Sequence, residues 1–225
     1  MIRTNTWNRI RYSVYAPLYD RIATLFNDSR RRSIDLLNLQ AGDRVLLLGA
    51  GTGIDLEFLP RGLDVTAIDV TPAMVKRIQT RAEQLQLPVK AHVMDGQALD
   101  LPDDHFDAVI LHLILAVIPD PYACIAEAVR VLKPGGHVAV FDKFLPDNTE
   151  ATLGRRIANK VSAFFFSEIN RQLAPIISTV PLEQTHQELA TRFQRFGYTI
   201  TVLRNLTNSS LISSDETVVH ERANG

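Results

Sequence analysis

The fold of this chain is decided by one stretch, Arg44-Val45-Leu46-Leu47-Leu48-Gly49-Ala50-Gly51-Thr52-Gly53. Its apolar run is typical of a strand buried on both faces, as in a parallel sheet covered by helices. Glycines at alternate positions let the backbone turn sharply and approach a ligand closely. We expect a helix over residues 54–59, whose free N–H groups would face that ligand. A glycine-rich turn that binds no ligand is the alternative interpretation.

A second strand is predicted over residues 64–69, and it ends on the carboxylate of Asp69. In nucleotide-binding folds, an acidic side chain about 20 residues beyond the glycines accepts hydrogen bonds from ribose hydroxyls. We therefore interpret Asp69 as a ribose ligand. Its alternative role, as the cap of the next helix, is less favoured because Thr71 and Pro72 already supply a cap and a first-turn proline.

Helices and strands alternate through the rest of the central region. The pattern predicts a helix over residues 74–85 and two strands over residues 88–94 and 106–111. A helix over residues 121–132, a turn over 133–136 and a strand over 137–142 follow. This alternation predicts an α/β fold with a Rossmann-like doubly wound sheet, which binds ligands at the carboxyl ends of its strands. Those ends carry Gly49 to Gly53, Asp69, Asp95, His112 and Asp142.

Composition limits the class of protein. The chain has 225 residues, 46% of them hydrophobic, which suits one domain with a sizeable core. A single cysteine, Cys124, excludes an internal disulfide and a cysteine-rich zinc site, and we see no dense metal-ligand motif. The N-terminus lacks the apolar run of a signal peptide, and no stretch approaches the roughly 18 apolar residues of a membrane span. We expect a cytoplasmic protein.

Two basic segments flank an acidic central region. Residues 1–32 contain seven arginines and two aspartates, and the apolar residues at helical spacing from Trp7 to Leu25 predict an amphipathic helix. Three of these arginines are consecutive, Arg30 to Arg32, and are either a solvated helix face or a phosphate-facing patch. We predict a helical lid over residues 1–38.

The second basic segment contains an aromatic insert, with Phe164, Phe165 and Phe166 on one face and Arg155, Arg156 and Lys160 on the other. We predict a helical substrate cap over residues 150–195. Two interpretations are open. The aromatic face packs on the core, or it is part of a basic amphipathic surface that contacts anionic membrane or houses an acyl chain.

The sequence resembles the class I S-adenosylmethionine (SAM) dependent methyltransferases over residues 40–145. Four stretches carry the resemblance: Leu48 to Gly53, the strand end at Asp69, Asp95-Gly96-Gln97-Ala98-Leu99, and Val131-Leu132-Lys133-Pro134-Gly135-Gly136. The family implies a seven-stranded sheet that ends in an antiparallel hairpin, here expected from residues 198–203 and 218–221 within a C-terminal segment 196–222. We expect one methyltransferase domain over residues 1–225, with its SAM-binding core at 40–145.

The resemblance also implies roles for individual residues. The glycine loop would surround the methionine part of SAM, Asp69 would hold the ribose, and Asp95 would accept a hydrogen bond from the adenine amino group. The implied cofactor-binding residues are Gly49, Ala50, Gly51, Gly53, Asp69, Val70, Asp95, Gly96, Gln97 and Tyr19, and the implied substrate-binding residues are Tyr15, Phe164 and Phe165. One position departs from the family pattern. Two residues before the first glycine, where the family places a carboxylate that helps to hold the methionine ammonium, this chain has Leu47.

Methyl transfer from a sulfonium needs an acceptor in line with the S–CH3 bond and the exclusion of water. A base is needed only when the acceptor arrives protonated. His112 and Asp142 are the candidates, since both lie at strand ends beside the predicted cleft. The alternatives are that His112 is a hydrogen-bonded wall residue and that Asp142 pairs with Lys143.

The predicted function is methyl transfer from SAM, which leaves S-adenosylhomocysteine, to a small-molecule or lipid acceptor. Residues 113–121, with Tyr15 to Asp20, resemble the bacterial phosphatidylethanolamine N-methyltransferases and their ubiquinone-pathway relatives, which suggests a phospholipid amine and a peripheral position on the membrane. Two alternatives stay open: a soluble metabolite as acceptor, and a SAM-binding module without catalysis, which Leu47 would explain. The modest basic charge makes nucleic acid an unlikely partner.

Overall fold

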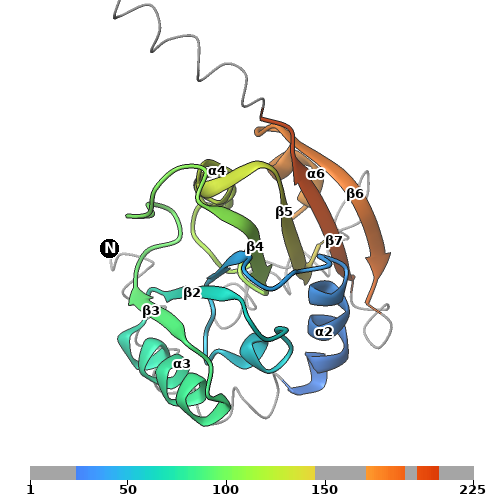
Figure 1. The fold of residues 1–225 in the computed structure, drawn as a ribbon. Coiled ribbons are helices and arrows are strands. Elements are labelled where there is room, and N and C mark those ends of the chain that lie inside the picture. The colour runs from blue at the N-terminus through green and yellow to red at the C-terminus, as the bar shows by residue number, and fades with distance from the viewer. Residues whose placement is uncertain (1–23, 145–170, 191–196, 208–225) are drawn as a thin grey trace, which may run out of the picture.

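A computed structural model describes residues 24–144, 171–190 and 197–207, which form a seven-stranded sheet of order β3-β2-β1-β4-β5-β7-β6. The first five strands of this order are parallel, whereas β7 runs antiparallel to both of its neighbours (Figure 1). The strands are β1 (Arg44–Leu48), β2 (Asp64–Asp69), β3 (Val89–Val93), β4 (Phe106–His112), β5 (Leu132–Lys143), β6 (Leu182–Leu189) and β7 (Tyr198–Asn205). The predicted α/β doubly wound fold is confirmed.

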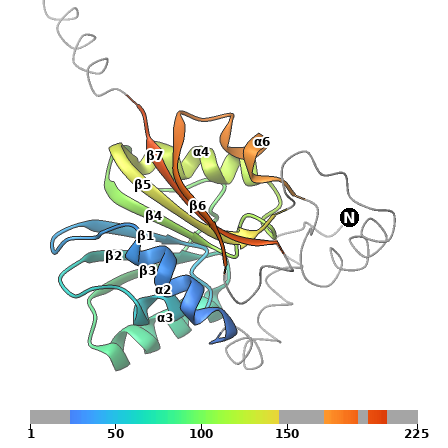
Figure 2. The same ribbon diagram turned by 90° about the vertical axis from the view of Figure 1, so that its right-hand side faces the viewer.

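Helices cover both faces of this sheet. One face packs against α2 (Asn27–Asp35) and α3 (Pro72–Leu85), and the other against α4 (Pro121–Val131) and the short α6 (Leu173–Ile177), as Figure 2 shows. The side chains of β1 alternate between the two layers, so that Leu46 and Leu48 contact the α4 side and Val45 and Leu47 the α2 side. Each of these four side chains is at most 1% exposed, which explains the uninterrupted apolar run in the sequence.

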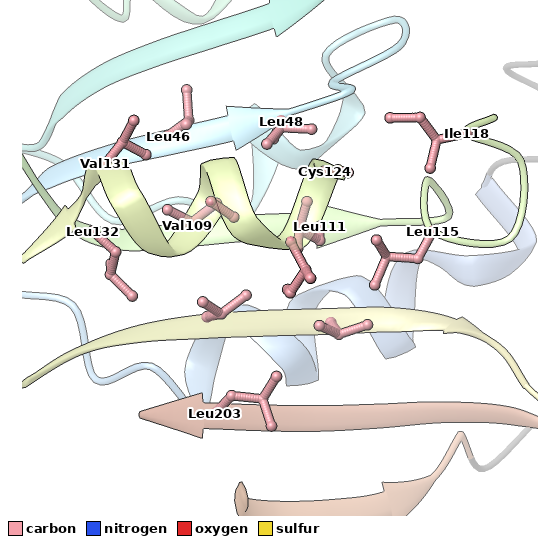
Figure 3. Close-up of a cluster of buried hydrophobic side chains, with 14 of the residues drawn as sticks. Leu46, Leu48, Val109, Leu111, Leu115, Ile118, Cys124, Val131, Leu132 and Leu203 are labelled. Carbon is pink, nitrogen blue, oxygen red and sulfur yellow. The ribbon is translucent and has the colours of Figure 1, made fainter. Parts of the chain in front are cut away.

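The core beneath α4 connects the sheet to the loop that follows β4. Figure 3 shows Leu111 of β4 among side chains from β1, α4 and β7, and Leu115 and Ile118 of the loop extend the same cluster. Leu115 is fully buried and Ile118 is 6% exposed. The loop after β4 is therefore anchored in the core by its own side chains.

The predicted terminal hairpin is only half correct. β7 contains the predicted strand 198–203, but its hairpin partner is β6, which precedes it, and residues 218–221 lie outside the described part of the chain. Residues 182–189 were expected within a helical cap, and that expectation is wrong. β6 is an edge strand whose side chains are mostly polar and at least partly exposed, so it lacks the apolar alternation that identifies a buried strand.

Two further elements differ from their predictions. The helix expected at residues 54–59 is a single 3₁₀ turn, Ile54–Glu57, entered from Gly53 at a φ of 74°. The turn expected at residues 133–136 is an irregular start of β5, because Phe106 pairs with Leu132 but Ala108 pairs with His137. Residues 133–136 of β5 therefore lie opposite the single residue Asp107 of β4. Gly135, within this irregular segment, has a φ of 75°.

Candidate cofactor site

A pocket opens at the carboxyl ends of β1, β2 and β4. Its walls contain seven of the residues predicted from the sequence: Gly49, Gly51, Asp69, Val70, Asp95, Gly96 and His112. The pocket therefore lies where the strand-end rule for doubly wound sheets expects a ligand to bind. Ala50, Gly53, Gln97 and Asp142 lie outside these walls, and Tyr15, Tyr19, Phe164 and Phe165 lie outside the described residues.

The glycine loop needs its glycines for conformation and for space. Gly49, Gly51 and Gly53 have φ angles of 70°, 56° and 74°, in the left-handed region that strains other residues. A Cβ on Gly49 would also lie 2.7 Å from Cδ1 of Ile114, a residue of the pocket wall. The loop is held in part by Ala50, whose N–H donates to the carbonyl of Ile68 at 2.9 Å.

Asp69 ends β2 and joins the glycine loop to the start of α3. Its Oδ2 accepts the N–H of Gly51 at 3.0 Å, and its Oδ1 accepts the N–H of Thr71 at 2.8 Å. Burial raises the pKa of the Asp69 carboxyl, and these two backbone N–H groups oppose the rise. The carboxylate therefore lines the pocket and fixes the backbone at Thr71, and Thr71, not Asp69, is the N-cap residue of α3.

Asp95 also lines the pocket, just beyond β3. Its Oδ1 accepts two hydrogen bonds from Gln97, from the backbone N at 3.0 Å and from Nε2 at 2.9 Å. The side-chain carbonyl of Gln97 in turn accepts the N–H of Asp120 at 2.8 Å. Gln97 thus connects Asp95 to the end of the loop that follows β4, although it does not itself line the pocket.

His112 ends β4 and has partners for both ring nitrogens. Its Nδ1 lies 2.8 Å from Oδ1 of Asp55, and its Nε2 lies 3.0 Å from Oγ of Ser33 in α2. Arg30, also in α2, contacts both carboxylate oxygens of Asp55 through Nη1, at 2.8 and 2.7 Å. All four residues are at least 94% buried.

The charge state of this network follows from its contacts. Burial alone would raise the pKa of the Asp55 carboxyl, but the Arg30 guanidinium and the His112 ring outweigh that effect and hold the pKa well below its usual range. The ionised Asp55 carboxylate can accept a hydrogen bond from Nδ1–H of His112, while Nε2 of the ring lies beside the Ser33 hydroxyl. His112 is the hydrogen-bonded wall residue of the alternative interpretation.

Asp142, near the end of β5, is not among the residues that line the pocket. Its Oδ2 accepts the N–H of Ala116 at 2.9 Å and its Oδ1 accepts the N–H of Lys143 at 2.7 Å. Burial raises the pKa of this carboxyl to about 6, and the backbone N–H groups of Ala116 and Lys143 oppose the rise. Asp142 holds the loop after β4 in place, and the expected link to Lys143 is made through that residue's backbone.

The three consecutive arginines separate into three environments. Arg30 is buried against Asp55, Arg31 lies over the ring of Phe58 at 5.0 Å, and Arg32 pairs with Glu188 of β6 at 3.0 Å. Neither sequence interpretation describes Arg30, since its guanidinium is neither solvated nor part of a surface patch. The helical period places adjacent residues 100° apart, which explains why three neighbours reach different partners.

One side of the pocket escaped the sequence analysis. It is built by the loop after β4, which contributes five apolar residues: Leu113, Ile114, Val117, Ile118 and Pro119. The segment had been noted only for its resemblance to lipid methyltransferases. A usable signal was present, because an apolar run that directly follows a strand end in a doubly wound sheet has to cover the ligand crevice.

Comparison with known proteins identifies the family. A family model described as a methyltransferase domain matches residues 46–140. The phosphatidylethanolamine N-methyltransferase of Cereibacter sphaeroides is 33% identical over 139 residues, which cover 61% of this chain and 66% of that protein. The demethylmenaquinone methyltransferase of Tropheryma whipplei is 30% identical over 172 residues, which cover 74% of this chain and 68% of that protein. This chain belongs to the class I SAM-dependent methyltransferases.

Solved structures agree with this family at the level of the fold. A geranyl diphosphate C-methyltransferase from Streptomyces coelicolor, in complex with S-adenosylhomocysteine, superposes with a TM-score of 0.67 at 15% identity, over 80% of each chain. A methyltransferase from Bacillus halodurans gives a TM-score of 0.68 over 80% of this chain and 100% of that one. The sequence relatives show the family, and the solved structures show that this chain shares their fold.

The residues that line the pocket of this methyltransferase suit SAM in charge and in the space left by glycine. Its glycine loop brings backbone, without side chains, to the edge of the crevice, and a Cβ on Gly96 would lie 2.6 Å from Cδ2 of Leu48. The carboxylates of Asp69 and Asp95 line the walls, which suits a ligand that carries a sulfonium and an ammonium group. Position 47 cannot hold that ammonium in this fold, since the Leu47 side chain is 1% exposed and packs in the core beneath α2.

Proposed function

We propose that this protein transfers a methyl group from SAM to a lipid-borne acceptor, with a phosphatidylethanolamine-type amine as the first candidate. The observation that carries the proposal is the mixed lining of the pocket. It combines the carboxylates of Asp69 and Asp95 with five apolar residues of the loop after β4, which we call the apolar wall. The relatives named as a phosphatidylethanolamine methyltransferase and a demethylmenaquinone methyltransferase support an apolar acceptor.

Asp69, Asp95 and the glycine loop would bind and orient the cofactor. Asp69 would accept hydrogen bonds from the ribose hydroxyls while its position is fixed by Gly51 and Thr71. Asp95, oriented by Gln97, would accept a hydrogen bond from the adenine amino group. When bound, SAM supplies a methyl group on a sulfonium, which is already an activated leaving group. The protein therefore needs to provide geometry more than acid–base chemistry.

The loop after β4 would exclude water from the reacting atoms. Ile114 lies against Gly49, and Val117 and Ile118 continue the same apolar wall. A dry crevice keeps the acceptor near the methyl group and strengthens the attraction between the sulfonium and the carboxylates. An acceptor with an apolar body suits this wall better than one that is polar throughout.

We propose positioning roles for the two predicted bases. Both ring nitrogens of His112 are engaged by Asp55 and Ser33, so accepting a substrate proton would require breaking one of these bonds. Asp142 accepts two backbone N–H groups and does not line the pocket. An amine acceptor would then bind as the free base and transfer its proton to water after methylation.

A labelling experiment tests this function. The protein is incubated with SAM carrying a labelled methyl group and with a bacterial extract, which is then separated into lipid and aqueous fractions. Label in the lipid fraction, enriched in methylated phosphatidylethanolamine, supports the proposal. Label in the aqueous fraction would identify a soluble metabolite as acceptor, and SAM binding without any transfer would identify a binding module.

Matched variants make the experiment specific to the site. Asp69→Asn removes one of two acceptor oxygens from the proposed ribose ligand and should abolish most of the label. Asp64→Asn lies on the same strand but pairs with Lys90 at the surface, 2.8 Å away, and should leave the label unchanged. Equal loss in both variants would contradict the assigned site.

A membrane contact is part of this proposal. Among the described residues, no helix is both long and apolar enough to cross a membrane. We propose that a lipid acceptor is reached from the bilayer surface, so that binding to anionic vesicles should weaken as salt concentration rises. Lipid methylation that is independent of salt would contradict an electrostatic contact.

A further inference from the structure

Arg171, directly before α6, is attached to the loop that forms the apolar wall of the pocket. Its Nη1 donates to the carbonyls of Leu115 at 2.6 Å and Ile118 at 2.7 Å, and its Nη2 lies 3.5 Å from the carbonyl of Pro119. One guanidinium thus holds three carbonyls of a single loop. Hydrogen bonds from a charged donor are among the strongest in proteins, and the planar arrangement of donors in arginine suits several acceptors at once.

Two other side chains hold the same loop from different elements. Asp142 of β5 accepts the N–H of Ala116, and Gln97 accepts the N–H of Asp120. Within the loop, the N–H groups of Val117 and Ile118 both donate to the carbonyl of Ile114, at 3.0 and 2.9 Å. A segment with so many fixed backbone groups has a defined position rather than a range of positions.

The loop also contains a strained residue at its first position. Leu113 has a φ of 59°, which is unfavourable for a side chain with a Cβ, and its N–H donates to the carbonyl of Phe141 at 2.7 Å. The surrounding contacts have to compensate for this strain. The geometry allows Ile114 to turn back over Gly49 and into the pocket.

We propose that Arg171 is a positioning residue of the methyl-transfer site, which sets the apolar wall against the cofactor by holding the carbonyls of Leu115, Ile118 and Pro119. This inference rests on the proposed function, because the wall matters only when a ligand occupies the pocket. Ile118 is well placed for this effect: a Cβ on Gly96, at the proposed adenine end, would lie 3.6 Å from its Cδ1. A displaced loop would therefore change the shape of the pocket beside Gly96.

The test uses the whole chain and three variants. Arg171→Met removes the guanidinium and keeps an apolar stem, and Arg171→Lys keeps the charge without the planar fork. The matched control is Arg61→Met, since Arg61 also donates to a backbone carbonyl, that of Gln86 at 3.4 Å, but outside the pocket walls. The measurements are calorimetric affinity for S-adenosylhomocysteine and amide hydrogen exchange without ligand.

We expect Arg171→Met to bind S-adenosylhomocysteine about tenfold more weakly, since the loop then has to be ordered when the ligand binds. The amides of Ala116, Val117 and Ile118 should exchange faster while those of β1 keep their rates. Arg171→Lys should lie between the wild type and Arg171→Met, and Arg61→Met should match the wild type within about twofold.

Two results would overturn the inference. One is a wild-type affinity in Arg171→Met despite fast exchange in the loop, which would mean that the position of the wall is unimportant. The other is faster exchange throughout the sheet, which would mean that Arg171 only stabilises the fold. If the wild type itself fails to bind S-adenosylhomocysteine, the proposed function is wrong, whereas the exchange rates still report whether Arg171 holds the loop.

Discussion

The buried pair Arg30–Asp55 leads to the sharpest prediction for stability. Both side chains are 4% exposed, and Nη1 of Arg30 lies 2.7 Å from Oδ2 of Asp55. Replacing Arg30 with Met leaves the Asp55 carboxylate buried with only His112 beside it. Removing one partner of a buried pair costs about 3–5 kcal/mol, because the other charge is left uncompensated. That is a large part of the roughly 5–15 kcal/mol that stabilises a typical domain.

The same helix supplies the control. Arg32 pairs with Glu188, but the Arg32 side chain is 51% exposed, so Arg32→Met should cost less than about 1 kcal/mol. Free energies of unfolding from urea denaturation, followed by circular dichroism, compare the two variants. The double variant Arg30→Met, Asp55→Asn should be destabilised by less than the sum of its two single changes, because it leaves neither charge buried alone. Equal costs for Arg30→Met and Arg32→Met would refute this reasoning.

The dependence on pH gives an independent check of the same pair. The pKa of Asp55 is lowered in the folded state, so the unfolded chain binds a proton more readily. The stabilisation is therefore complete above the unfolded pKa of about 3.9 and is lost as the pH falls below it. Asp55→Asn should lack this acid-sensitive contribution. An identical loss of stability on acidification in the wild type and Asp55→Asn would contradict the ionised pair.

Three further predictions concern the pocket and its supports. Gly49→Ala should weaken S-adenosylhomocysteine binding by at least about tenfold in calorimetry. The alanine Cβ would be strained at a φ of 70° and would push Ile114 into the pocket. Unchanged affinity would show that the loop can adapt. Asp69→Asn should weaken the same binding by a similar factor, with Asp64→Asn as the control, and equal affinities would remove Asp69 from the site. Burial raises the pKa of Asp142 to about 6, so the folded state keeps this proton to a higher pH than the unfolded state does. The free energy of unfolding should therefore fall by about 3 kcal/mol as the pH rises from about 4 to 6. Urea denaturation across this range should show a smaller fall for Asp142→Asn, and parallel curves would contradict the raised pKa.

Sequence patterns located the features of the site that local backbone geometry requires. A buried strand followed by alternating glycines permits few other structures, and the φ angles of Gly49, Gly51 and Gly53 confirm that glycine is needed there. Asp69 and Asp95 were found for a related reason, since each lies at the end of its strand. Such residues can be read from a few neighbouring positions because the sheet brings the ends of parallel strands together.

Partners that are distant in the sequence could not be predicted in this way. Arg30 lies 25 residues before Asp55, and Ser33 lies 79 residues before His112. No local pattern indicates which carboxylate a helical arginine will meet, so Arg30 to Arg32 were interpreted as one face. Strand β6 was missed for a different reason, because a polar edge strand buries few of its side chains and shows no apolar period.

The contacts of His112 and Asp142 show why a residue at the right strand end need not act on the substrate. Their strand-end positions predicted general bases, whereas the contacts of His112 with Asp55 and Ser33, and of Asp142 with the loop after β4, support the proposed positioning roles. Methyl transfer from a sulfonium tolerates this arrangement, because the leaving group needs no proton. In such an enzyme the polar groups around the pocket are available for positioning, which is the role proposed for Arg171 through its contacts with the loop after β4.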